Sequence, residues 1–207
     1  MDVNRFKQLP IMGILRGVEA HQIEPLVETV TSSGLHTVEI TMNTSGAAEL
    51  IRRMADTAQG RLTIGAGTVL TMDDLHTALD AGATFIVLPT LVQSVVEYCD
   101  RNGIPVFPGA LTPQEIYNAW CAGATMVKVF PSKFFGPDYF KELKGPFQDV
   151  ELLACGGVSV DNIRSCFSCG ASAVAFGESV FRKEWLEARE FARIREGIEA
   201  LIAGVKT

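Results

Sequence analysis

The chain has 207 residues, a formal net charge of −6 at pH 7 and 47% hydrophobic residues, which suits one globular domain spanning 1–207. The acidic balance argues against a nucleic-acid partner, and no run approaches the roughly 20 apolar residues that a membrane-spanning helix needs. The start, MDVNRFKQLP, lacks the apolar stretch of a secretory signal, so we expect a cytoplasmic protein with no membrane partner. The five cysteines include one C-x-x-C, at Cys166 and Cys169; it lies in a helical pattern without a second pair, which favours structural thiols in a reducing compartment.

Eight short β-rich runs alternate with helical patterns along the chain. The runs cover residues 11–16, 37–42, 62–68, 84–89, 105–108, 126–130, 151–154 and 173–176. Helical periodicity covers residues 24–33, 45–58 and 73–81, and residues 184–204 are predicted to form one long amphipathic helix.

Glycine stands between several of these helices and the strand that follows, in the segments SSGLH, DAGAT, DRNGI, CAGAT and SCGAS. A glycine at this place supplies the left-handed residue that closes a helix. Eight strand–helix units without a linker predict an α/β fold, a single-domain (β/α)8 TIM barrel, in preference to an open doubly wound sheet.

A lysine interrupts the predicted strand MVKVF. Alternation places Val127 and Val129 on the face towards the helices, so Lys128 should point into the barrel. One interpretation is a lysine that reaches the rim or pairs with an acid. The second interpretation, which we favour, is that Lys128 is a nucleophile. Burial disfavours the charged form of a lysine, and a neutral amine can attack a ketone. Lys133 is a weaker candidate, since it lies in a loop with access to water.

A glutamate interrupts the predicted strand HTVEITMN in the same way. Its alternation directs Glu39 inwards. A buried carboxylate is costly without a partner, so Glu39 should either pair with Arg16 or Lys128 or take part in chemistry. Beside a Schiff base it could carry the protons that a retro-aldol reaction moves.

Glycines cluster at the ends of the last two predicted strands, in ACGGVS and FGESVF. Barrels often bind phosphate at this place through bare backbone N–H groups. The clusters therefore predict a phosphate site that includes Gly156, Gly157, Gly177 and Ser179. Glu178 would repel a phosphate there unless its side chain points away, and we expect it to point outward.

These segments together resemble the bacterial class I aldolases for 2-keto-3-deoxy-6-phosphogluconate (KDPG) and 4-hydroxy-2-oxoglutarate (KHG), with their 6-phosphogalactonate (KDPGal) relatives. The resemblance covers essentially the whole chain and rests on an ordered set of segments: PIMGILRG, VEITMNT, IGAGTVL, VLPTL, PVFPGALTP, VKVFPS, GPF, ACGGVS and FGESVF. It implies a Schiff base on Lys128, proton transfer by Glu39, a pyruvyl carboxylate site at Thr68 and the Pro108-Gly109 turn, and a phosphate site at the two glycine clusters. It also implies a homo-oligomer, commonly a trimer.

Three positions depart from the pattern of the KDPG enzymes. Asn43 stands where these usually carry arginine, and Asn43 and the segment PSKFFGP are similar to the KDPGal enzymes. Cys155 matches neither group, and Glu178 replaces a residue that is often glycine.

We therefore expect a class I aldolase that cleaves KDPG to pyruvate and glyceraldehyde 3-phosphate, without a cofactor or a metal. Lys128 and Glu39 are the expected catalytic residues, and the expected substrate-binding residues are Arg16, Thr68, Pro89, Phe130, Cys155, Gly156, Gly157, Gly177 and Ser179. KDPGal or KHG is the alternative substrate. A sugar-phosphate epimerase or isomerase and a non-catalytic keto-acid-binding barrel are the alternative classes.

Overall fold

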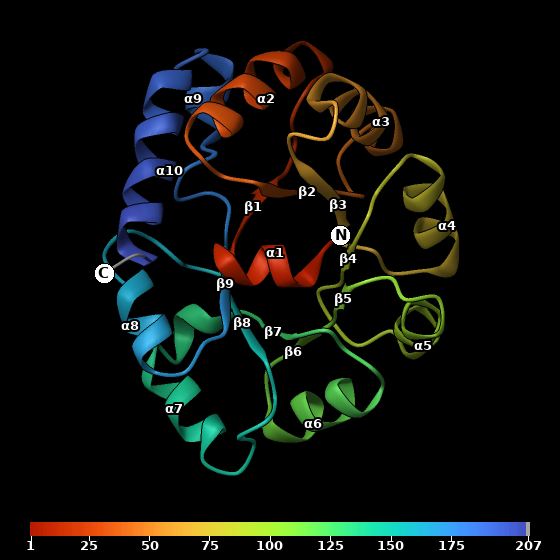
Figure 1. Cartoon of the computed structure of the whole chain (residues 1–207), viewed down its shortest axis with the longest axis vertical. Coiled ribbons are helices and arrows are strands. Elements are labelled where there is room, and N and C mark those ends of the chain that lie inside the picture. The colour runs from red at the N-terminus through yellow and green to blue at the C-terminus, as the bar shows by residue number, and fades with distance from the viewer. Residues whose placement is uncertain (206–207) are drawn as a thin grey trace.

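The computed structural model of the chain describes residues 1–205. Its strands are β1 Ile11–Leu15, β2 Thr37–Thr41, β3 Thr63–Gly67, β4 Ile86–Val87, β5 Val106–Phe107, β6 Gly109–Ala110, β7 Val127–Val129, β8 Leu152–Cys155 and β9 Ala173–Phe176. All pairs are parallel and follow the order β5-β4-β3-β2-β1-β9-β8-β7-β6. Helices surround the strands (Figure 1), which confirms the predicted barrel.

The fifth predicted strand is divided at Pro108, which separates β5 from β6 and brings the number of strands to nine. Proline has a fixed φ and no N–H, so it interrupts a strand ladder. The segment still closes the barrel, because it pairs with β4 on one side and with β7 on the other. On the β7 side the backbone N–H of Lys128 donates to the Pro108 carbonyl at 2.8 Å. The eight predicted strands are therefore confirmed as barrel positions, with this one division.

The helices of the outer ring are α2 Ile23–Ser32, α3 Ala47–Ala58, α4 Met72–Asp80, α5 Gln93–Arg101, α6 Pro113–Cys121, α7 Asp138–Lys144, α8 Ile163–Ser168, α9 Lys183–Glu187 and α10 Phe191–Val205. Short 3-10 turns, η1 Ala20–Gln22 and η2 Ser132–Phe134, follow β1 and β7. The glycines predicted to close helices all have positive φ, which confirms their role: Gly34, Gly82, Gly103, Gly123 and Gly170.

The prediction of one long helix over residues 184–204 was wrong. The segment forms α9 and α10, separated at Arg189, which has a φ of 58°. The N–H of Glu190 donates to the carbonyl of Trp185 at 2.8 Å, the bond that closes a helix behind a left-handed residue. Because neither glycine nor proline marks this stop, the amphipathic pattern continues across it.

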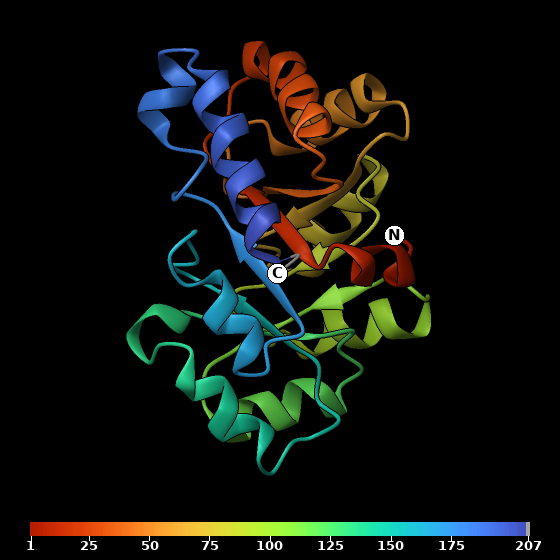
Figure 2. The ribbon, with the colours of Figure 1, turned by 60° about the vertical axis from the view of Figure 1, so that its left-hand side comes forward.

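A further helix, α1 Val3–Gln8, closes the N-terminal end of the barrel. Its Phe6 packs inside the barrel with Phe107 at a ring distance of 6.1 Å, and Phe107 packs in turn on Phe85 at 5.9 Å. Figure 1 shows α1 across the centre of the barrel, and Figure 2 shows it at one end. The opposite end, where the strands finish, is left for the site.

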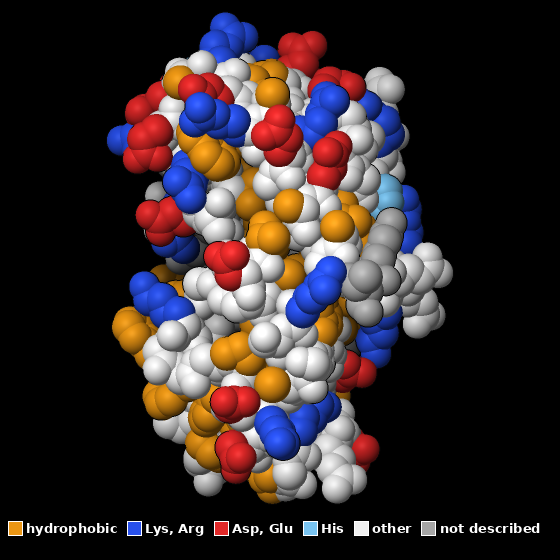
Figure 3. Space-filling view, turned by 90° about the vertical axis from the view of Figure 1, so that its left-hand side faces the viewer, with side chains coloured by type: hydrophobic (Ala, Val, Ile, Leu, Met, Phe, Trp, Pro, Cys, Tyr) orange, Lys and Arg blue, Asp and Glu red, His pale blue; other side chains and the backbone are white. Residues whose placement is uncertain are grey.

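The surface carries both signs of charge. On the face shown in Figure 3, basic and acidic side chains are interspersed, and neither sign forms a continuous field. Among residues 1–205, no helix is long and apolar enough to cross a membrane.

Candidate active site

A cavity of about 1330 Å³ lies at the C-terminal ends of the strands. The predicted site residues on this side lie at or just beyond the ends of the strands, where active sites of this fold lie. Glu39 and the Pro108-Gly109 turn do not line the cavity. The other predicted site residues do, namely Arg16, Thr68, Pro89, Lys128, Phe130, Cys155, Gly156, Gly157, Gly177 and Ser179.

Lys128 lies in the middle of β7, between valines that pack in the outer core. Its neighbour on the same face, Met126, packs inside the barrel, so the predicted inward direction of Lys128 is confirmed. The side chain is only 6% exposed, and its Nζ lies 5.2 Å from the centre of the Phe130 ring. Within residues 1–205 it forms no salt bridge. A largely desolvated amine is thus presented to the cavity.

Glu39 lies on β2 behind the cavity wall and is 1% exposed. Its Oε2 has no hydrogen-bond partner among the described residues. Burial raises the pKa of this carboxyl above its usual 4.5, and the positive charges of Lys128 and Arg16 oppose the shift. Neither cation forms a direct ion pair with it in the described part of the chain. Glu39 is therefore an unsatisfied acid within the electrostatic reach of Lys128.

Gly67 makes room for the Glu39 carboxylate, a role that the sequence analysis missed. A Cβ at Gly67 would lie 2.5 Å from Oε1 of Glu39, well inside ordinary contact distance. Two residues earlier on the same face of β3, Gly65 makes room for the Phe85 ring. Glycine inside a strand is a signal for such a close approach, although the sequence does not say what approaches.

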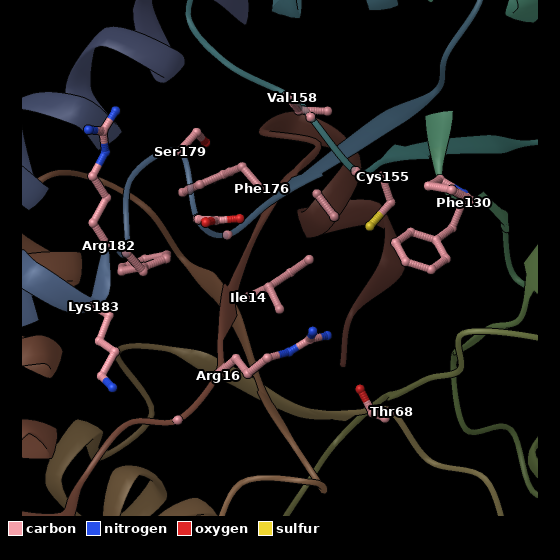
Figure 4. Close-up of a pocket in the computed structure, with 18 of the residues that line it drawn as sticks. Ile14, Arg16, Thr68, Phe130, Cys155, Val158, Phe176, Ser179, Arg182 and Lys183 are labelled. Atoms are coloured by element: carbon pink, nitrogen blue, oxygen red, sulfur yellow. The ribbon is translucent and has the colours of Figure 1, made fainter. Parts of the chain in front are cut away.

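Arg16 and Thr68 follow β1 and β3. Figure 4 shows their polar ends directed into the same space. Thr68 has a φ of 56°, a left-handed conformation that non-glycine residues adopt rarely and that occurs at functional sites. Beside Arg16, the N–H of Gly17 donates to the Thr44 hydroxyl at 3.0 Å, which fixes the loop after β1. Arg16 and Thr68 together can hold a carboxylate.

Cys155 ends β8 and faces the cavity, with its sulfur towards the Phe130 ring (Figure 4). Burial raises the pKa of its thiol, and the charge of Lys128 opposes the shift. The thiol is thus protonated at neutral pH and acts as a small, weakly polar side chain. The C-x-x-C cysteines lie elsewhere, on and after α8. No group of three or more His, Cys, Asp or Glu that could hold a metal occurs in the described chain.

The two glycine clusters meet on one side of the cavity. Gly156 and Gly157 have φ values of 91° and 85°, and within residues 1–205 no acceptor bonds their N–H groups. The buried Oγ of Ser179 also has no partner in this part of the chain. Three donors are therefore free to bind an anion.

Charged side chains also line the cavity. Glu178 is exposed there, as are Lys133, Arg182 and Lys183. The sequence analysis did not single out Arg182 and Lys183, because they lie beyond the end of the last strand in a polar segment without a motif. Lys133 is exposed as predicted, with Nζ 5.1 Å from the Phe134 ring centre. Two further exposed carboxylates, Glu184 and Glu187, also line the cavity, and Glu187 Oε1 lies 3.6 Å from Lys183 Nζ.

The sequence of the chain is similar to those of known proteins. A family model described as KDPG and KHG aldolase matches residues 3–197. The chain belongs to this family. A KDPGal aldolase of Escherichia coli is 32% identical over 84% of this chain and 86% of its own length, and a KDPG aldolase of Haemophilus influenzae is 30% identical over 92% and 93%.

Solved structures of family members have the same fold. The structure named "Native KDPGal structure" has a TM-score of 0.89 and 30% identity, covering 96% of this chain and 95% of that one. A KDPG aldolase from Legionella pneumophila, with pyruvate captured as a covalent carbinolamine intermediate, has a TM-score of 0.87 and 25% identity, with 95% of each chain covered. The protein is accordingly an aldolase, a carbon–carbon lyase.

Proposed function

We propose that this family member is a class I aldolase that cleaves KDPG to pyruvate and glyceraldehyde 3-phosphate through a Schiff base on Lys128. The observation that carries the proposal is a buried lysine that forms no salt bridge among residues 1–205, lines a cavity and lies near a carboxyl with an unbonded oxygen. Support also comes from the Legionella relative, in which pyruvate is held as a carbinolamine.

The reaction begins when the neutral amine of Lys128 attacks the C2 ketone. Loss of water from the carbinolamine leaves an iminium ion, which withdraws electrons from C3. Glu39, directly or through a water molecule, takes the proton of the C4 hydroxyl, and the C3–C4 bond breaks. Its electrons form the enamine, and the aldehyde leaves. Protonation of the enamine at C3 by Glu39, followed by hydrolysis, releases pyruvate and restores Lys128.

The raised pKa of Glu39 suits this double task. A carboxyl with an ordinary pKa would keep its proton poorly at neutral pH and would be a weak acid catalyst for the enamine. Burial shifts the carboxyl towards the range in which it both accepts and returns a proton. The positive charges of Lys128 and Arg16 oppose that shift.

The two ends of the substrate match the two polar sides of the cavity. Arg16 and Thr68 would hold the carboxylate of the pyruvyl part, against Pro89 and Phe130. The free N–H groups of the glycine clusters and the Ser179 hydroxyl would bind the phosphate. Arg182 also lines the cavity and adds positive charge, whereas Lys183 forms a salt bridge with Glu187.

KDPGal, the C4 epimer, is the second candidate substrate. It is favoured by Asn43, which replaces the arginine of the KDPG enzymes, and by the 32% identical KDPGal aldolase. Asn43 is exposed and does not line the cavity, so it makes no direct contact that would select the epimer. KHG is the candidate if the anion site does not take phosphate.

Borohydride reduction in the presence of pyruvate tests the mechanism. One pyruvyl adduct at Lys128 is expected, and an adduct at Lys133, or none, would overturn it. Turnover without an adduct would indicate an epimerase or isomerase, and binding without turnover a non-catalytic barrel. Pyruvate release from KDPG, KDPGal and KHG, measured side by side, ranks the substrates. We also propose a homotrimer, which light scattering tests; the cytoplasmic location stays a prediction.

A further inference from the structure

Ser132 lies directly behind the glycine pair that ends β8. It is the first residue of η2 and is 6% exposed. Its hydroxyl lies 2.9 Å from the carbonyl oxygen of Cys155 and 3.1 Å from that of Gly156, and it donates to them. Gly156 and Gly157 line the cavity, whereas Ser132 does not. The serine therefore contacts the far side of the loop.

Because peptide units are planar, the direction of the two carbonyls fixes the direction of the neighbouring N–H groups. The Cys155 carbonyl shares its peptide unit with the N–H of Gly156, and the Gly156 carbonyl shares its unit with the N–H of Gly157. In a trans peptide the C=O and N–H bonds point in opposite directions. Because both carbonyls point to Ser132, both N–H groups point away from it. Because Gly156 and Gly157 line the cavity and Ser132 does not, we infer that the N–H groups face the cavity; they have no acceptor within the described chain.

Two successive N–H groups directed to one side form a concave anion site. The φ values of 91° and 85° make this arrangement open to glycine and strained for other residues. A Cβ at Gly157 would also lie 2.6 Å from the Cβ of Lys133, so η2 packs tightly on the loop. The loop is held from behind by the same turn that carries Ser132.

We propose that Ser132 is a positioning residue that holds the Gly156 and Gly157 amides towards the cavity for a phosphoryl group of the substrate. The proposal rests on the proposed function, in which the cavity takes a phosphorylated keto acid. Ser132 touches no substrate atom. It acts through the backbone, by keeping two carbonyl dipoles behind the loop and two N–H dipoles in front of it.

A merely structural tether would leave a different signature. If Ser132 only joins η2 to β8, its loss weakens the fold and affects every substrate alike. If it orients the anion site, its loss weakens only the binding of phosphorylated ligands. The split between phosphorylated and unphosphorylated substrates therefore separates the two roles.

The experiment compares Ser132→Ala and Ser132→Cys with the wild type on KDPG, KDPGal and KHG. Loss of one hydrogen bond in this arrangement should raise KM for the phosphorylated acids about threefold to tenfold, with kcat and the KM for KHG nearly unchanged. Cysteine fills the space of serine but is a poor donor, so Ser132→Cys should show the same defect. Recovery of KM by cysteine would show that packing matters and would overturn the proposal.

Ser33→Ala is the matched control. Ser33 is 8% exposed, and its hydroxyl donates to the Val30 carbonyl at 2.7 Å at the end of α2, outside the cavity. The Ser33→Ala variant should lose about as much unfolding free energy as Ser132→Ala does, without any change in KM. An equal change of KM on all three substrates in Ser132→Ala, or no change on any, would contradict the proposal.

Inorganic phosphate separates this inference from the proposed function. Calorimetric titration of the wild type with inorganic phosphate should show binding, weakened about threefold to tenfold in Ser132→Ala. If the wild type binds phosphate and the variant loses it, the inference stands even if KDPG and KDPGal are not substrates. If the wild type does not bind phosphate, or the variant binds it equally well, the inference is wrong, whatever the enzyme cleaves.

Discussion

Gly67→Ala tests whether the space around Glu39 sets the rate of the reaction. Gly67 has no positive φ, so its backbone conformation accepts alanine. The new Cβ would lie 2.5 Å from Oε1 of Glu39, where ordinary contacts begin at 3.4 Å. The carboxylate must therefore move by about 0.9 Å. It can do so because it is the end of a flexible side chain with an oxygen that no described residue bonds.

The expected loss follows from that displacement. A shift of a catalytic group by about 1 Å can cost about 100-fold in rate. We expect kcat for aldol cleavage to fall about 100-fold, while pyruvate still forms its borohydride-trapped adduct on Lys128. The fold should persist, since the clash falls on one mobile side chain. Pyruvate release coupled to lactate dehydrogenase, adduct mass and thermal unfolding measure the three quantities.

Gly65→Ala is the control on the same strand and face. Its Cβ would lie 2.4 Å from the ring of Phe85, which is fully buried and cannot move away. This variant should lose about 1–3 kcal/mol of unfolding free energy through overpacking, and its activity per folded molecule should fall less than in Gly67→Ala. If Gly67→Ala retains activity within about threefold of the wild type, the assignment of Glu39 as the proton-transfer group is refuted.

Three further predictions concern charges at the site. Lys128→Met should lose cleavage at least about 1000-fold and form no adduct with pyruvate; a trapped adduct elsewhere in an active variant would contradict the mechanism. Glu39→Gln should lower kcat about 100-fold or more. Since burial raises the pKa of Glu39, ionisation destabilises the folded state as pH rises above the unfolded value of 4.5, so the unfolding free energy of Glu39→Gln should gain on the wild type between pH 4 and pH 8 in urea titrations. A pH-independent difference would count against this. Glu178→Gly should barely change KM for the phosphorylated acid, whereas a large fall in KM would show that the carboxylate faces the anion site.

The barrel could be predicted from sequence because its signals are local. Strand alternation and left-handed glycines act over a few residues, and each of the five glycine stops has the expected positive φ. The errors arose where local signals were absent or shared. Arg189 closes α9 without glycine, and Pro108 divides a strand whose two halves still complete one barrel position.

The two central site residues could be predicted because they violate the rule for buried strands. Lys128 and Glu39 are charged where covered strands are apolar, and both are almost fully buried in the structure. The residues that support Lys128, Glu39 and the anion site could not be predicted, because their roles depend on contacts between segments far apart in the sequence. Gly67 and Ser132 act on partners 28 and 23 residues away, which come close only when neighbouring strand–helix units pair in the folded sheet.

The unsatisfied oxygen of Glu39 explains why those supporting residues matter. A buried polar group without a partner costs about 1–3 kcal/mol, and more when it is charged, so packing alone would favour an apolar residue at this position. Nearby polar groups could satisfy it, but an ion pair would lower its pKa and a tight hydrogen bond would fix its proton. Gly67 instead leaves the carboxylate space without a partner. The same logic holds at Gly156 and Gly157, where Ser132 satisfies the carbonyls and leaves the N–H groups free. In both places the neighbouring residues fix the position of a polar group, the Glu39 carboxylate or the glycine N–H groups, without bonding to it. The group is therefore available to bind the substrate.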